Sequence, residues 1–282
     1  MLDLILQGAL TFGLIRRIQQ SSGALTVEQP DDEVWRFRSA RPLPAFNALL
    51  PDLEELCIDH AFVPPGLQLS NFRLIVFDMD STLINVECID ELAVYAGKKT
   101  EVARLTESAM RGELDFHDSL RRRVALLKGL PQEVLQRVYD ERLQLNPGGT
   151  EVLEASRNAG LKTAVISGGF KDIADRLCRD HGIDFAVSNV LSRSDGILDG
   201  SVSGEIIDAE AKLKHFRRLQ RQLNVSTSQC IAVGDGANDL LTLQAAGLSV
   251  AYHAKTVLRQ AADVCIDFGG LQRLLPLFDR QA

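Results

Sequence analysis

The segment Leu74-Ile75-Val76-Phe77 is an apolar run that ends at two acids, Asp78 and Asp80, followed by the hydroxyls of Ser81 and Thr82. A short apolar run with polar residues behind it is typical of a buried parallel strand. In open α/β sheets, the carboxyl ends of such strands form the edge at which ligands bind. We therefore expect Asp78 and Asp80 to lie in a functional site whose other parts come from the rest of the chain.

Strands and helices alternate after this run. The pattern predicts strands at residues 161–167, 185–191, 229–234, 248–252 and 264–268, and helices at residues 171–181, 208–223 and 239–246. Residues 201–207 are predicted to form a hairpin arm, with a turn at Asp195-Gly196. This alternation predicts a doubly wound α/β domain with a parallel sheet, which we place at residues 69–282.

Between the first two strands of this domain the pattern is helical. Apolar residues recur at helical spacing from Val86 to Ala96, and further helices are predicted from about Thr100, Phe116 and Pro131. We interpret residues 86–145 as a four-helix insertion that caps the sheet edge. A cap in this position is suited to keep water away from the site.

Residues 1–68 form a separate block. Its predicted elements are a strand, a helix, two strands, a helix and a strand, at residues 2–6, 11–20, 24–28, 34–38, 44–50 and 56–63. This βαββαβ order is the split ferredoxin-like pattern, and the turn residues Pro64-Pro65-Gly66 mark its end. The block resembles an ACT-type module, and the resemblance implies a regulatory or dimerising domain and, through it, a homodimer. A plain packing or dimerisation domain is the simpler alternative.

Composition excludes several classes of protein. The net charge of −7 and the isoelectric point near 5.3 argue against general binding of nucleic acid or anionic membranes. The 5 cysteines are scattered and include no Cys-x-x-Cys pair, which indicates reduced thiols and a cytoplasmic location. No apolar run is long enough to span a bilayer, and the stretch from Leu2 to Ile15 lacks the basic flank of a signal peptide. We therefore expect a soluble protein.

Polar residues follow each predicted strand of the larger domain. Asp78 and Asp80 follow the first strand, Ser167-Gly168-Gly169 the second, and Gly234 to Asp239 the third, while a helix start contributes Lys212. Carboxylates are suited to Mg²⁺, whereas bare backbone amides and a lysine are suited to phosphoryl oxygens. The reaction that these groups fit is phosphoryl transfer.

The spacing of Asp78 and Asp80 allows a division of roles. Beyond the strand, the chain can curl so that both acids face one substrate. Asp78 is then placed to attack phosphorus, which would divide hydrolysis into formation and breakdown of an aspartyl phosphate. Asp80 is placed to move a proton on the leaving oxygen, and this role requires a raised pKa.

Four motifs in order resemble those of the haloacid dehalogenase (HAD) phosphatases. They are Asp78-Met79-Asp80-Ser81-Thr82, Ser167-Gly168-Gly169, Lys212, and Gly234-Asp235-Gly236-Ala237-Asn238-Asp239. The resemblance implies that Asp78 is the nucleophile and Asp80 the general acid and base. It also implies that the cofactor Mg²⁺ is held by the Asp78 carboxylate, the Asp80 backbone carbonyl and Asp235, with Asp239 in support. The phosphoryl group is then held by Ser167, Lys212 and the Gly168 amide, and oriented by Asn238.

Within that superfamily, the residues around Glu87 and the segments Met110 to Phe116 and Ser119 to Val124 resemble the phosphoserine phosphatase family. The resemblance implies a small-molecule substrate, O-phosphoserine, hydrolysed to serine and phosphate in the last step of serine biosynthesis. Glu87 then binds the substrate ammonium and Arg123 its carboxylate, while Met110 and Phe116 close over it. These two charges are also the handles that a small zwitterion requires.

Each of these residues has a structural alternative. Asp235 and Asp239 could cap a helix, Glu87 could interact with a helix dipole, and Arg123 could belong to a solvated face. Met110 and Phe116 could be core residues. The rival functions are a HAD phosphatase or phosphotransferase for another small phosphomonoester, such as phosphohomoserine, and a binding protein with an inactive HAD body.

Overall fold

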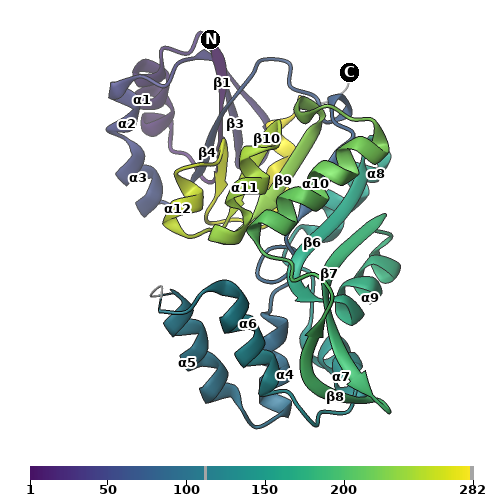
Figure 1. The fold of residues 1–282 in the computed structure, drawn as a ribbon. Coiled ribbons are helices and arrows are strands. Elements are labelled where there is room, and N and C mark those ends of the chain that lie inside the picture. Colours follow the sequence, from purple (N-terminus) through teal and green to yellow (C-terminus); the bar gives the residue numbers. More distant parts are fainter. Residues whose placement is uncertain (111–112, 280–282) are drawn as a thin grey trace.

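The computed structural model describes residues 1–110 and 113–279, and it contains two sheets in two packed lobes (Figure 1). The larger sheet has seven strands in the order β11-β10-β9-β5-β6-β7-β8, and the smaller has four in the order β2-β3-β1-β4. The predicted fold class, a parallel α/β domain with a small α+β domain before it, is confirmed. None of the described helices is long and apolar enough to cross a membrane.

The N-terminal domain has the predicted βαββαβ order. Its elements are β1 (Leu2–Gln7), α1 (Phe12–Ser22), β2 (Thr26–Asp31), β3 (Val34–Ala40), α2 (Pro44–Asn47), α3 (Leu50–Glu55) and β4 (Asp59–Val63). The helix predicted at residues 44–50 is two short helices instead of one. Pro51 sits in the first turn of α3, where its missing N–H costs nothing, but a helix running through it would lose a hydrogen bond.

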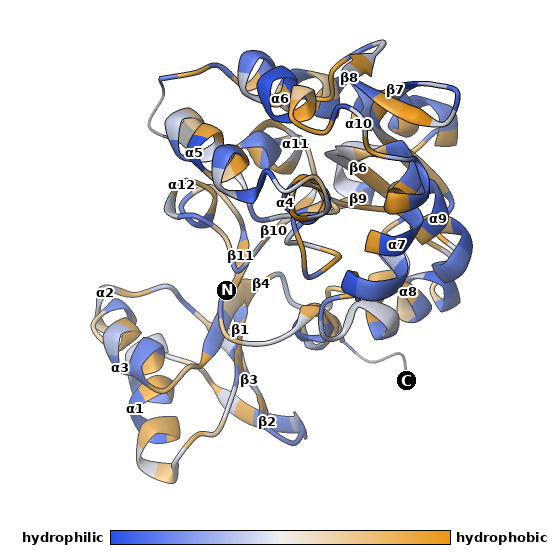
Figure 2. Cartoon of the chain, turned by 90° about the horizontal axis from the view of Figure 1, so that it is seen from below, coloured by the Kyte–Doolittle hydropathy of each residue, from blue (hydrophilic) through white to orange (hydrophobic). Residues whose placement is uncertain are grey.

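The small sheet is covered on both faces. Leu4 and Phe37 pack with α1 to α3, which gather on one side of the sheet (Figure 2). Ile5 and Val63 point the other way, because strand side chains alternate, and they join the core of the larger domain. The N-terminal sheet therefore lies between its own helices and the larger domain.

Strand β5 (Leu74–Phe77) is the centre of the large sheet. It pairs in parallel with β6 (Lys162–Phe170) on one side and with β9 (Cys230–Gly234) on the other. The sheet continues with β10 (Leu248–Tyr252) and β11 (Val264–Ile266) beyond β9, and with β7 (Phe185–Ser194) and β8 (Ile197–Ser203) beyond β6. Only the β7–β8 pair is antiparallel among the described pairs of this sheet, and its turn is the predicted Asp195-Gly196. Because the strand order continues on both sides of β5, the carboxyl end of β5 is the topological switch point of the sheet. In open α/β sheets, this is the place where ligands bind.

Helices cover both faces of this sheet. Ile75 and Phe77 pack on the face of α8 (Gly149–Asn158) and α9 (Lys171–His181). Leu74 and Val76 pack on the face of α10 (Ala209–Leu223). The short helices α11 (Leu240–Gln244) and α12 (Thr256–Arg259) come later in the domain, and the last element among the described residues is a 3-10 segment, Leu271–Leu277.

The segment between β5 and β6 holds one helix more than predicted. The four expected helices are α4 (Cys88–Tyr95), α5 (Lys99–Met110), α6 (Phe116–Ala125) and α7 (Glu133–Arg142). The fifth is α8, which was not predicted. Helices α4 to α6 stand apart from α1 to α3 in both views of the fold (Figures 1 and 2).

The two domains are joined through Asp59 on β4. Its buried carboxylate accepts the backbone N–H groups of Asp267 (2.7 Å), Phe268 (3.2 Å) and Gly269 (3.2 Å). Arg273 adds an ion pair of 2.5 Å. A buried carboxylate with four donors strongly resists separation from them. The N-terminal domain is thus fixed to the loop after β11.

Candidate active site

Asp78 stands directly after β5 with its carboxylate held on two sides. Its Oδ1 accepts the N–H of Met79 at 2.7 Å, and its Oδ2 lies 2.9 Å from Nζ of Lys212. Lys212 comes from the first turn of α10, which begins at the N-cap Asp208. The geometry leaves Asp78 paired and fixed at the switch point, as a nucleophile requires.

The side chain of Lys212 is only 1% exposed and lies between two carboxylates, Asp78 at 2.9 Å and Asp239 at 2.7 Å. Burial alone would lower the pKa of Lys212. The charges of Asp239 and Asp78 outweigh that effect and raise the pKa above its usual value. Lys212 therefore remains an ammonium inside the protein.

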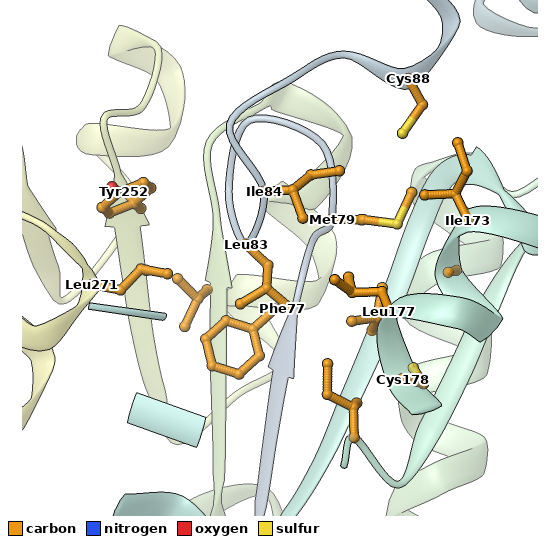
Figure 3. Packing of buried hydrophobic residues seen from close by; sticks show 14 of the residues in the cluster. Phe77, Met79, Leu83, Ile84, Cys88, Ile173, Leu177, Cys178, Tyr252 and Leu271 are labelled. Atoms are coloured by element: carbon orange, nitrogen blue, oxygen red, sulfur yellow. The ribbon is translucent and has the colours of Figure 1, made fainter. Parts of the chain in front are cut away.

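Met79 separates the two acids of the first motif and points away from them. Its side chain is fully buried and is directed toward Ile173 and Leu177 of α9 (Figure 3). A Cβ on Gly169 would lie 2.5 Å from its terminal methyl, so this glycine makes room for it. With Met79 anchored in the core, Asp78 and Asp80 are both left facing the site.

Asp80 has the environment of a carboxylic acid that keeps its proton. Its Oδ2 accepts the N–H of Cys88 at 3.1 Å, and its Oδ1 accepts the thiol of the same residue at 2.9 Å. Burial and the nearby charge of Glu87 raise the pKa of Asp80 well above its usual value. An acid with a raised pKa next to a carboxylate that is paired with a lysine is the arrangement that acid catalysis beside a nucleophile requires.

Three acids form a cluster beside Asp78. Carboxylate oxygens of Asp78, Asp235 and Asp239 lie within 4.8 Å of one another. Burial and the charge of Asp78 raise the pKa of Asp235 to about 6, which reflects crowded negative charge. Hard oxygen donors at such distances fit a small divalent cation.

The hydrogen bonds in this cluster distinguish its members. Asp239 uses one oxygen for Lys212, and the other accepts the N–H of Gly236 at 3.1 Å. Asp235 accepts one bond, from the hydroxyl of Thr82 at 2.7 Å, through Oδ1. Asp235 is thus freer to hold a cation, and Asp239 is placed to position Lys212.

Glycines bring backbone close to the acids. A Cβ on Gly234 would lie 2.6 Å from the carboxyl carbon of Asp239, and one on Gly236 would lie 2.3 Å from Oδ1 of Asn238. The N–H of Gly169 donates to the hydroxyl oxygen of Ser167 at 2.9 Å, so the Ser167 proton is available to a ligand. Backbone N–H groups and a hydroxyl in such close turns are suited to phosphoryl oxygens.

A cavity of about 400 Å³ opens over these groups and brings together side chains from the sheet edge and the helical insertion. The predicted site residues that line it are Asp78, Asp80, Glu87, Phe116, Arg123, Ser167, Gly168, Asp235 and Asn238. Lys212 and Asp239 lie behind it, bonded to Asp78 and to each other. The side chain of Met110 lies outside the described residues.

The residues expected to bind substrate come from the insertion. Glu87 accepts the hydroxyl of Ser81 at 2.7 Å, and Ser81 adopts a left-handed backbone with φ of 58°. Arg123 is half-buried, and its Nε donates a long hydrogen bond of 3.4 Å to the Ser119 carbonyl. Phe116 reaches within 3.4 Å of the Cβ position of Gly168. The insertion therefore forms one wall of the cavity.

Several residues of the site were not predicted from the sequence. Thr82 holds Asp235, and Cys88 holds Asp80. His117 bonds Asp208 at 2.7 Å and ties the insertion to the start of α10. Lys255 lines the cavity. Thr82 belongs to the first motif and could have been found there, whereas the other three have no local sequence signal.

Comparisons with known proteins agree with this geometry. The family model described as haloacid dehalogenase-like hydrolase matches residues 72–247. A phosphoserine phosphatase of Albidiferax ferrireducens is 50% identical over 237 residues, which are 82% of this chain and 98% of that protein.

Solved structures agree as well. A probable phosphoserine phosphatase from Vibrio cholerae, in unliganded form, superposes with a TM-score of 0.83 at 34% identity, over 98% of this chain and 85% of that one. A phospho-aspartyl intermediate analogue of a phosphoserine phosphatase superposes with a TM-score of 0.69 at 39% identity, over 74% of this chain and 99% of that one. The chain belongs to the haloacid dehalogenase-like hydrolases and, within them, to the phosphoserine phosphatases.

Proposed function

We propose that the protein hydrolyses O-phosphoserine to serine and phosphate through an aspartyl-phosphate intermediate, as the last step of serine biosynthesis. One observation carries the proposal. The carboxylate of Asp78, 2.9 Å from the buried ammonium of Lys212, shares a cavity with Asp80, an acid whose pKa is raised. The names of the relatives identify the substrate class, and a phosphatase that forms a phospho-aspartyl group is among the similar structures.

The first half of the reaction transfers the phosphoryl group to the enzyme. A carboxylate oxygen of Asp78 attacks phosphorus while the bond between phosphorus and the serine oxygen breaks. Asp80 donates its proton to that oxygen, which leaves as the serine hydroxyl. Lys212, Ser167 and the Gly168 amide are the donors that neutralise the phosphoryl oxygens.

The second half returns the enzyme to its starting state. Asp80, now a carboxylate, accepts a proton from a water that attacks phosphorus. The bond between phosphorus and Asp78 breaks, inorganic phosphate forms, and Asp78 is again ionised. The Cys88 N–H and thiol keep Asp80 in place through both steps.

We propose Mg²⁺ as the cofactor, held by the Asp78 carboxylate, the Asp80 backbone carbonyl and Asp235. The oxygens of the acid cluster fit this hard cation. The cation would supply positive charge at the phosphoryl oxygens. Asp239, with both oxygens already bonded, supports Lys212 and the Gly236 backbone.

We propose that the insertion at about residues 86–145 selects the substrate. Glu87 and Arg123 offer one negative and one positive handle at the cavity, which match the ammonium and carboxylate of phosphoserine. Phe116 is placed to cover the phosphate end beside Gly168. We also propose that Met110, like Phe116, closes over the substrate. Because both charged handles lie in the insertion, substrate binding would favour closure.

A phosphate-release assay tests this function. We expect turnover of O-phosphoserine in the presence of Mg²⁺ to exceed that of phosphohomoserine and of sugar phosphates by at least about tenfold in kcat/KM. Chelation of the metal should abolish activity, and added Mg²⁺ should restore it. Equal or better turnover of a sugar phosphate would refute the substrate assignment, and transfer to an added alcohol would identify a phosphotransferase.

We also propose that residues 1–68 form an ACT-like domain that pairs two chains, and that residues 69–282 form the phosphatase domain. Within the described part of the chain, β2 is an edge of the smaller sheet, and its residues are mostly exposed. A free edge can pair with the same edge of a second chain across a two-fold axis.

We also propose a cytoplasmic location. The chain's 5 cysteines are all free, which suits a cytoplasmic enzyme.

Sedimentation of the full chain tests the pairing. We expect a species of twice the 31.0 kDa of one chain. Replacing the exposed Thr26 on β2 with lysine should weaken it, while Val257→Lys, at an exposed position of α12, should not. A single 31.0 kDa species at every concentration would refute the homodimer.

A further inference from the structure

Lys255 is a cation of the active-site cavity that neither the motifs nor the catalytic geometry includes. It follows β10 and is the N-cap residue of α12. Its backbone N–H donates to the carbonyl of Asp235 at 3.0 Å, and it lines the cavity together with Asp235 and Asn238. Its backbone is therefore fixed to the loop that carries the acid cluster.

The other cations of the site are already engaged. Lys212 is buried behind the cavity between Asp78 and Asp239. Arg123 lies on the wall formed by the insertion. Lys255 is exposed, and within residues 1–110 and 113–279 its ammonium has neither an ion pair nor a hydrogen bond. It is thus available to a ligand.

The side chains that line the cavity are more often acidic than basic, and this indicates a role for the Lys255 ammonium. Of the acids that line it, Asp78 is paired with Lys212 and Asp80 is hydrogen-bonded to Cys88. Glu87, Asp90 and Asp235 remain, against the two cations Arg123 and Lys255. Acidic groups thus outnumber the cations that face an approaching phosphomonoester, so the anion is repelled. An unpaired ammonium in this cavity would offset that repulsion and raise the local concentration of the anion.

We propose that Lys255 captures the phosphate end of the substrate and holds inorganic phosphate before release, as a specificity residue for dianionic phosphates. The proposal rests on the phosphatase function proposed above. Since Lys255 acts on the approach and binding of the anion, its contribution belongs mainly to KM and to product inhibition. It takes no part in forming or breaking a bond to phosphorus.

The test compares Lys255→Met with Lys255→Arg and with Lys128→Met. Lys128 is likewise exposed but does not line the cavity. We expect Lys255→Met to raise KM for O-phosphoserine and KI for inorganic phosphate by about three- to tenfold, with kcat within about twofold. The loss should shrink as salt is added, because screening weakens exposed charges. Lys255→Arg should retain most of the affinity.

Two results would overturn the proposal. The first is that Lys255→Met and Lys128→Met have the same kcat/KM for O-phosphoserine and the same KI for inorganic phosphate at low salt. The other is a change confined to the Mg²⁺ concentration that gives half-maximal activity, which would make Lys255 a neighbour of the metal site only. Calorimetric titration of inorganic phosphate with Mg²⁺ present still tests Lys255 if O-phosphoserine proves not to be the substrate, so the two failures are distinguishable.

Discussion

Asp78→Asn is expected to lower kcat for O-phosphoserine by on the order of 10⁴-fold or more, because the amide cannot form the acyl phosphate. The fold should persist. Lys212 loses its 2.9 Å partner but keeps Asp239 at 2.7 Å, so no buried cation is left alone. Phosphate release at saturating substrate, with circular dichroism and thermal melts of both proteins, measures the two effects separately.

A matched control for this variant is Asp195→Asn. Asp195 is exposed at the β7–β8 turn with φ of 50°, a left-handed backbone that asparagine also tolerates. We expect wild-type activity and stability from it. Residual turnover above about a hundredth of wild type in Asp78→Asn, without deamidation, would contradict the covalent mechanism.

Much of the fold follows from local signals. The apolar run of β5, the turn at Asp195-Gly196 and the helix over residues 208–223 each depend on local signals, and each was predicted within about one residue of where it occurs. Helix α8 was missed because Pro147-Gly148-Gly149 indicates a loop, whereas its buried Val152 and Leu153 become visible as a helical face only against the sheet.

The residues of the candidate site likewise differ in whether local sequence could predict them. Asp78, Ser167 and Asp235 could be predicted because each follows a strand, and the topology brings strand ends together. Lys212 required the order of the family motifs, since nothing local distinguishes it from a surface lysine. Cys88 depends on where the helical insertion settles over the sheet edge, and a one-dimensional pattern does not contain that placement.

Lys212→Met should have the second large effect. The substitution removes the cation between Asp78 and Asp239, and both carboxylates then lie buried without their partner. Leaving a buried charge unpaired costs about 3–5 kcal/mol. We expect the free energy of unfolding at pH 8 to fall by about that amount, and kcat/KM to fall by about 10³-fold through lost phosphoryl stabilisation. Lys214→Met, in the same helix with a side chain 67% exposed, should change neither.

The pH dependence of this fall in the free energy of unfolding distinguishes the loss of a charge interaction from the loss of packing. Burial and the charge of Asp78 already raise the pKa of Asp239 above that of an unfolded chain. Without Lys212, the attraction that stabilises the ionised form of Asp239 is lost, and the pKa of Asp239 rises further. The folded variant therefore takes up a proton at a higher pH than folded wild type does, so its loss of stability relative to wild type is largest above the raised pKa of the variant. The loss should shrink as pH falls toward about 7, the pKa of Asp239 in wild type, because below that pH both folded proteins carry the proton. Urea titrations of both proteins between pH 6 and 9 measure it, and a loss of constant size over that range would assign it to packing.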